Sequence, residues 1–199
     1  MLPIELSGLT MTINGVACGL KSVSRHSIVF VVPQALSSTT DGTSYPVVIN
    51  NQGTVMKTTV TIVPARPDVF NTVRIAAPGG RALMYNITNR VHTTEPFTTF
   101  TVRLRGGQRV PSVMRIYVTG VANTTSSVIS IRIGPSLPIV QPRILTGGVM
   151  VEPGVYTIDF LMPSEINGAG DQPVIVTVTA AGVSFNSRLD DTAPRVRIL

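Results

Sequence analysis

The sequence is poor in cysteine, aromatic and charged residues, and these shortages limit how the chain can be stabilised. Cys18 is the only cysteine, so no disulfide bond can form within the chain, and we expect its thiol to be buried as a small apolar group. There is no tryptophan and only 5% of the residues are aromatic, so the core must consist mainly of branched aliphatic side chains. Charged residues make up 13% of the chain, whereas about 25% is usual in soluble domains.

Long apolar segments are missing as well. No segment approaches the roughly 18 apolar residues that a membrane-spanning helix needs, so we expect no membrane span. The residues that follow Met1, LPIELSG, have neither the basic nor the apolar region of a signal peptide. We therefore expect either a cytoplasmic protein or a fragment whose signal peptide lies upstream.

Valine, isoleucine and threonine are abundant, in short runs that glycine and proline interrupt. Runs such as LTMTI at 9–13 and VMKTTVTIV at 55–63 alternate between apolar and polar residues, which predicts half-buried strands. No segment has an apolar period of 3.6 over ten or more residues. The sequence therefore predicts an all-β fold, and the spacing of the strands, about 8 to 12 residues, is typical of a β-sandwich.

Two parts of the chain carry the same landmarks in the same order. The matching pairs are TING at 12–15 with IRIG at 131–134, FVVP at 30–33 with FLMP at 160–163, and YPVVI at 45–49 with QPVIV at 172–176. Such an internal repeat predicts two Ig-like β-sandwich units in tandem, residues 1–66 and residues 67–199 with its linker hairpins. We expect Phe30 and Phe160 to occupy equivalent buried positions in the two units.

The two units differ at their beginnings. In the second unit, the strand RIYVTG at 115–120 lies about 16 residues before IRIG, whereas nothing long enough precedes TING in the first. The first unit is therefore predicted to lack its N-terminal strand and to have an open edge at Leu9, Met11 and Ile13. A strand of another chain, the segment 98–104 or a swapped terminus would fill this edge, and self-association is the outcome if no internal segment reaches it.

The net charge is +6, and only Lys21 and Lys57 are lysines. The arginines are scattered along the chain except for one group, Arg103, Arg105, Arg109 and Arg115. We interpret this group as a possible interaction surface for an anionic polysaccharide or for lipid headgroups. The alternative is that these arginines are simply solvated positions of strands. The scatter of the other arginines argues against a specific nucleic-acid partner.

Residues 11–34, MTINGVACGLKSVSRHSIVFVVPQ, resemble the C-terminal module of secreted proteins from Acidobacteria such as Solibacter. The resemblance continues through ARPDVF at 65–70, VEPGVYTIDFLMP at 151–163 and GDQPVIVTVTAAGVSFNS at 170–187. It implies two Ig-like, TIG-like sandwiches in an exported protein, an extracellular or cell-surface location, and a signal peptide upstream. It implies no catalytic residues, and the linker at 88–110 departs from the proline- and alanine-rich stretch of the family.

No arrangement of residues points to catalysis or to a cofactor, and we expect a non-catalytic structural or adhesive module. The alternative is a carbohydrate-binding accessory module of an exported hydrolase, although sugar binding usually relies on exposed aromatic rings and the chain has only four tyrosines. Adjacent carboxylates can bind calcium, but Asp190 and Asp191 alone offer too few ligands, and Asp171 would have to join them. The sequence leaves this calcium question open.

Overall fold

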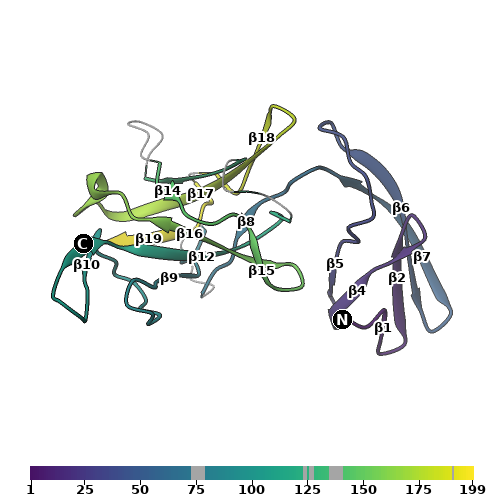
Figure 1. Ribbon diagram of the computed structural model, residues 1–199. Coiled ribbons are helices and arrows are strands. Elements are labelled where there is room, and N and C mark those ends of the chain that lie inside the picture. Colours follow the sequence, from purple (N-terminus) through teal and green to yellow (C-terminus); the bar gives the residue numbers. More distant parts are fainter. Residues whose placement is uncertain (73–78, 123–124, 126–127, 135–140, 190) are drawn as a thin grey trace. The chain divides into compact units, whose positions relative to one another are not determined.

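The chain consists of short β-strands joined by turns, as a computed structural model shows (Figure 1). The structure describes residues 1–72, 79–122, 125, 128–134, 141–189 and 191–199. These residues contain no α-helix, and the element η2 (Ser164–Ile166) is a single 3-10 turn. None of the described segments forms a helix with the length and apolarity needed to cross a membrane. The prediction of an all-β, sandwich-like fold is confirmed.

The chain divides into two compact units, unit 1 (Met1–Pro64) and unit 2 (Ala65–Leu199). In unit 1, one sheet has the order β1–β2–β6–β7, with β3 also paired to β2, and β4 and β5 form a separate hairpin. Figure 1 shows this hairpin opposite the larger sheet. The strands of unit 1 are β1 (Glu5–Leu6), β2 (Leu9–Ile13), β3 (Val16–Ala17), β4 (Gly19–Val23), β5 (Ile28–Val31), β6 (Thr43–Asn51) and β7 (Thr54–Ile62).

Strand β2 is an interior strand of its sheet. It pairs with β6 along its whole length on one side, and with β1 and then β3 on the other side. The backbone N–H of Cys18 also donates to the carbonyl of Met11 (2.9 Å). The side chains of Leu9, Met11 and Ile13 face the core and are at most 5% exposed. The predicted open edge is therefore not at Leu9, Met11 and Ile13, because local hairpins close the side of β2 that β6 leaves free.

The core of unit 1 is small. Its buried apolar residues are Leu9, Met11, Ile13, Cys18, Leu20 and Val47. Cys18 is buried as expected, and this burial raises the pKa of its thiol. Phe30, however, is only partly buried at the border of this core. The prediction of full burial is wrong for Phe30, because one side of β5 has no neighbouring strand in the described structure.

Unit 2 has two larger antiparallel sheets that enclose one core. One sheet has the order β14–β16–β12–β8, with β15 and β9 at its ends, and the other joins β13, β17 and β18, with β19 also on β17. Phe160 is fully buried between them, as predicted. The strands of unit 2 are β8 (Asp68–Val69), β9 (Met84–Asn86), β10 (Phe100–Val102), β11 (Arg109–Pro111), β12 (Val113–Thr119), β13 (Ile129–Ile133), β14 (Arg143–Ile144), β15 (Val149–Glu152), β16 (Val155–Leu161), β17 (Gly170–Ala180), β18 (Val183–Asn186) and β19 (Arg195–Ile198).

Candidate functional site

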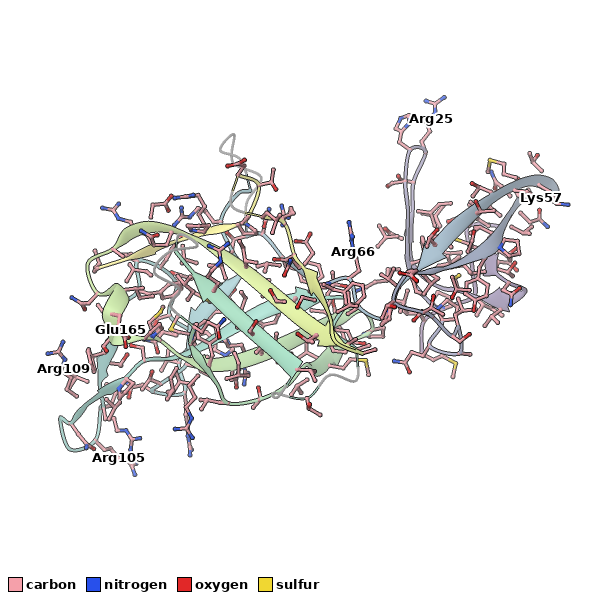
Figure 2. The ribbon with its side chains drawn as sticks, turned by 90° about the horizontal axis from the view of Figure 1, so that it is seen from above. Arg25, Lys57, Arg66, Arg105, Arg109 and Glu165 are labelled. Carbon is pink, nitrogen blue, oxygen red and sulfur yellow. The ribbon has the colours of Figure 1, made fainter. Side chains whose placement is uncertain are left out.

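The β10–β11 hairpin of unit 2 carries three of the four arginines that the sequence grouped together. β10 and β11 pair antiparallel, and two successive glycines with positive φ form the turn between them. Arg103, Arg105 and Arg109 are exposed on this hairpin. Within the described part of the chain, none of the three has a carboxylate at ion-pair distance. Figure 2 shows Arg105 and Arg109 projecting away from the ribbon. We call residues 100–111 the basic hairpin.

Arg115 does not belong to this surface. It lies on β12, where its Nε and Nη2 donate to the two carboxylate oxygens of Asp159 on β16, both at 2.8 Å. This two-point hydrogen bond raises the pKa of Arg115 and neutralises its charge locally. The predicted group of four is thus three arginines on a hairpin, without an ion pair to any described residue, and a fourth arginine in an ion pair. The sequence could not show this, because the two partners are 44 residues apart.

Side-chain contacts fix the shape of the basic hairpin. The amide of Asn89 donates to the carbonyl of Val102 (3.0 Å), and its oxygen accepts from the backbone N–H of Leu104 (3.3 Å). The guanidinium of Arg109 lies 4.5 Å from the ring centre of Phe100, a cation–π contact. These contacts fix the conformation of the hairpin, while the side chains of its turn remain exposed.

The tip of the basic hairpin combines positive charge with apolar surface. Leu104 is 79% exposed and lies between Arg103 and Arg105 in the sequence, and Val102, which directly precedes Arg103, is 58% exposed. Arg90, which follows Asn89 directly, is also exposed and adds a fourth positive charge beside the hairpin. Sequence reasoning missed Arg90 because the contacts of Asn89 with the hairpin are not local. Such a surface can attract anions and bury aliphatic groups at the same place.

A second feature of unit 2 is a small group of aromatic rings on the outer side of β9 and β12. The rings of Tyr85 and His92 are stacked with centroids 5.2 Å apart, and Tyr117 meets Tyr85 edge to face at 6.0 Å. Arg115 pairs with Tyr85 in the strand register, so the Arg115–Asp159 ion pair borders these rings. Aromatic faces beside a charged hydrogen-bonding pair are one way to hold a sugar ring. Tyr156, in contrast, is buried and takes no part.

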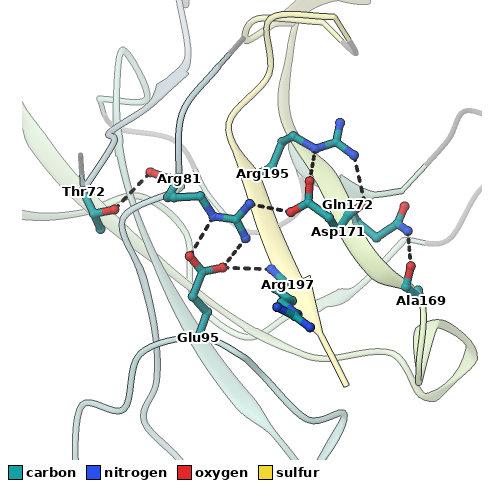
Figure 3. Close-up of polar contacts among 8 residues, drawn as sticks. All are labelled: Thr72, Arg81, Glu95, Ala169, Asp171, Gln172, Arg195 and Arg197. Atoms are coloured by element: carbon teal, nitrogen blue, oxygen red, sulfur yellow. Dashed lines mark hydrogen bonds and ion pairs between the residues drawn. The ribbon is translucent and has the colours of Figure 1, made fainter. Parts of the chain in front are cut away.

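Asp171, the third candidate calcium ligand, is engaged in a different interaction. Its carboxylate accepts from Arg81 and Arg195, and Arg81 also binds both oxygens of Glu95 (Figure 3). The backbone N–H of Arg197 donates to Glu95 at 2.8 Å. This ion-pair network joins residues near the start of unit 2 to β17 and β19. Its arginines occupy the oxygens that a calcium ion would need.

The charges in this network shift one another's titration. Burial pushes the pKa of Asp171 upward, but the hydrogen bonds from Arg81 and Arg195 outweigh it and lower the pKa overall. The pKa of Glu95 is likewise lowered, because hydrogen bonds from Arg81 and Arg197 exceed the effect of burial. Asp190 lies outside the described residues, and the described ones include no group of three metal-ligating side chains that contains Asp191. The network stabilises the fold and does not resemble a metal site.

Unit 2 also has an open cleft of about 700 Å³ beside β8 and β18. Arg188 on its wall donates to Asp68 (2.9 Å) and to the carbonyl of Val69 (2.9 Å), so its charge is already paired. Arg66 is the other arginine on the cleft wall. The cleft therefore offers less charge to a ligand than the basic hairpin does.

Comparison of the chain with protein-family models, with curated proteins and with solved structures finds no match. The resemblance to the Acidobacteria module stays a prediction.

Proposed function

We propose that this chain is a non-catalytic, Ig-like adhesive and structural module of an exported bacterial surface protein. In this proposal the basic hairpin binds an anionic polysaccharide outside the cell. One observation carries it: Arg103, Arg105 and Arg109 lack carboxylate partners among the described residues and share with the exposed Leu104 a hairpin that is fixed at its base. The resemblance of residues 11–34 to a secreted module supports the extracellular location.

The physical basis is long-range attraction followed by short-range contact. Unpaired arginines raise the local concentration of a polyanion, and their guanidinium groups match the geometry of carboxylate or sulfate groups. Leu104 then covers the aliphatic face of a sugar or of another polymer unit. Because Asn89 already holds the hairpin in shape, binding costs little conformational entropy.

Binding of the full chain to immobilised polygalacturonate and to uncharged dextran tests the proposal. We expect retention on the anionic polymer only, and a loss of retention as salt screens the charges. A triple variant with Arg103→Gln, Arg105→Gln and Arg109→Gln should bind about tenfold more weakly or worse, since exposed ionic contacts contribute up to about 1 kcal/mol each.

A matched control removes the same charge elsewhere. Arg25, Lys57 and Arg66, which Figure 2 labels, are exposed and none of them belongs to the basic hairpin; Arg25 and Lys57 are residues of unit 1. Their triple substitution by glutamine lowers the net charge equally and should leave retention nearly unchanged. Equal losses in both triple variants would show that only net charge matters and would refute a specific role of the basic hairpin.

The aromatic group of unit 2 favours the second candidate, a carbohydrate-binding accessory module. Tyr85 and Tyr117 form an edge-to-face pair beside the Arg115–Asp159 ion pair, an arrangement suited to a neutral sugar. A glycan array tests it directly. Hits that Tyr117→Ala removes would favour this candidate, whereas an array without neutral-sugar hits would eliminate it.

A further inference from the structure

The pairing schemes of the two units correspond strand by strand. β2, β6 and β7 pair in the same order as β13, β17 and β18. A shift of 130 residues places Ile28 and Phe30 of β5 on Ile158 and Phe160 of β16. The cross-strand pair Leu20↔Phe30 in unit 1 then matches Ile144↔Phe160 in unit 2. β5 and β16 are therefore equivalent strands.

The equivalent strands differ in their neighbours. β16 has β14 and β15 on one side and β12 on the other, where six residue pairs join it to β12. β5 has only β4, and no other strand of the described residues pairs with it. The backbone shows the same difference: the N–H of Met162 donates to the carbonyl of Ser112 before β12 (2.8 Å), whereas the equivalent N–H of Val32 has no acceptor among the described residues.

The side chains that β12 covers in unit 2 remain uncovered in unit 1. Ile158 and Phe160 are fully buried, and Met162 is 2% exposed. Their counterparts are Ile28 and Phe30, which are only partly buried, and Val32, which is 41% exposed. Met114, Ile116 and Val118 of β12 supply the cover in unit 2, and all three are fully buried. Unit 1 thus lacks both hydrogen-bonding partners and core side chains at the same edge.

We propose that the free edge of β5 accepts a strand from a partner polypeptide. This strand runs antiparallel to β5 and has bulky aliphatic side chains at alternate positions, as β12 does beside β16. The segment 98–104 cannot serve, because it forms β10 and its turn within the basic hairpin. A second copy of the chain is a poorer fit. Pairing of two β5 edges would extend the sheet, but the apolar side chains of each β5 would stay on the core of their own unit and would add no cover to the other core.

The edge of β5 is suited to such pairing. Ile28–Val31 contains no charged residue and no proline, the usual means of protecting an exposed edge. β7 is also at the edge of its sheet, but its counterpart β18 is an edge strand too, so no strand is missing there. β7 further carries Lys57. The comparison between the units therefore singles out β5.

A peptide with the sequence of residues 112–120, SVMRIYVTG, is the probe. Added to the full chain, it should slow hydrogen exchange of the amides in β5, read by mass spectrometry or NMR. At a peptide concentration one hundred times the Kd, the unfolding equilibrium constant of unit 1 should fall about 100-fold. A control peptide with serine in place of its methionine, isoleucine and second valine cannot fill the core and should have no effect. Protection at β7 instead, or equal effects of both peptides, would overturn the proposal.

Two variants complete the test. Val32→Lys places a charge where the apolar side chain of the donor strand would pack and should weaken peptide binding by tenfold or more. Val55→Lys on β7, at a residue that is also exposed, should not. If sedimentation shows a dimer of the chain alone, and the amides of β5 are protected in that dimer, a second copy occupies the edge and the proposal fails. The site shares no residue with the basic hairpin, so a failure here leaves the polysaccharide test unaffected.

Discussion

Truncation of the two equivalent phenylalanines should affect the two units differently. Phe160 lies between Met114 of β12 and Ile144 of β14 in the strand register, and it is fully buried. Its replacement by alanine removes the transfer free energy of the ring and leaves a cavity with walls on both sides. We therefore expect a loss of about 3–5 kcal/mol in the free energy of unfolding of unit 2.

Phe30 has Leu20 on one side in the register and no strand on the other. Water and neighbouring side chains can reach the space that Phe30→Ala creates, so most of the cavity cost disappears. Only part of the ring was removed from water on folding. We expect a loss of about 1–2 kcal/mol in unit 1 at this position.

Hydrogen exchange resolved by residue gives the free energy of opening of each unit separately, which a single melting curve would not. A loss of less than about 1 kcal/mol in the free energy of unfolding for Phe160→Ala, or equal losses for the two variants, would contradict this expectation. A further check uses the SVMRIYVTG peptide. When it occupies the edge of β5, the cost of Phe30→Ala should rise toward that of Phe160→Ala, because the ring then lies between two strands.

Arg81→Met should destabilise unit 2 by about 1–2 kcal/mol at neutral pH, because it removes the arginine that Glu95 pairs with and one of the two arginines that Asp171 pairs with. Folding lowers the pKa of both carboxyl groups, so this stabilisation is fully present above their ordinary pKa values of 4.5 and 3.8 and is lost as pH falls through the folded pKa values. A difference in urea midpoint between the variant and the unchanged protein that is the same at pH 7 and at pH 2 would contradict it. Gly120→Ala should cost more than about 3 kcal/mol, since φ is +70° and the new Cβ would lie 1.8 Å from the carbonyl oxygen of Arg66. Gly53→Ala, with φ +93° and no atom within 4 Å of its Cβ, should cost only about 1–2 kcal/mol in a thermal melt.

The sequence predicted the strands well because alternation is a local property. In β12, for example, Met114, Ile116 and Val118 are fully buried and the residues between them are partly exposed, as the period of two requires. The repeat could also be predicted from the sequence, because its landmarks are prolines and glycines at fixed places within or just after strands. These signals need no knowledge of which strands pair.

The pairing of strands could not be predicted in the same way. The sequence indicated that unit 1 has no counterpart of RIYVTG, but it did not show which strand that counterpart would join. The sequence predicts the open edge at β2, the strand that follows directly along the chain. In unit 2, however, the strand that contains most of RIYVTG is β12, and it pairs with β16 and not with β13, the counterpart of β2. Arg115 was misplaced for the same reason, since its partner Asp159 comes from a distant strand. In both cases the position depends on a pairing between residues that are far apart in the sequence.

The two proposed surfaces differ in how they depend on folding. The basic hairpin belongs to unit 2, whose core is large, and its shape is already fixed by Asn89, so the proposed polyanion would bind it without further ordering. Unit 1 has six buried apolar residues for 64 residues of chain, a small core for a domain of this length. A donor strand at β5 would enlarge that core, so the free energy of binding it would also be free energy of folding. Partner binding should therefore stabilise unit 1 strongly, while polysaccharide binding should leave its stability unchanged.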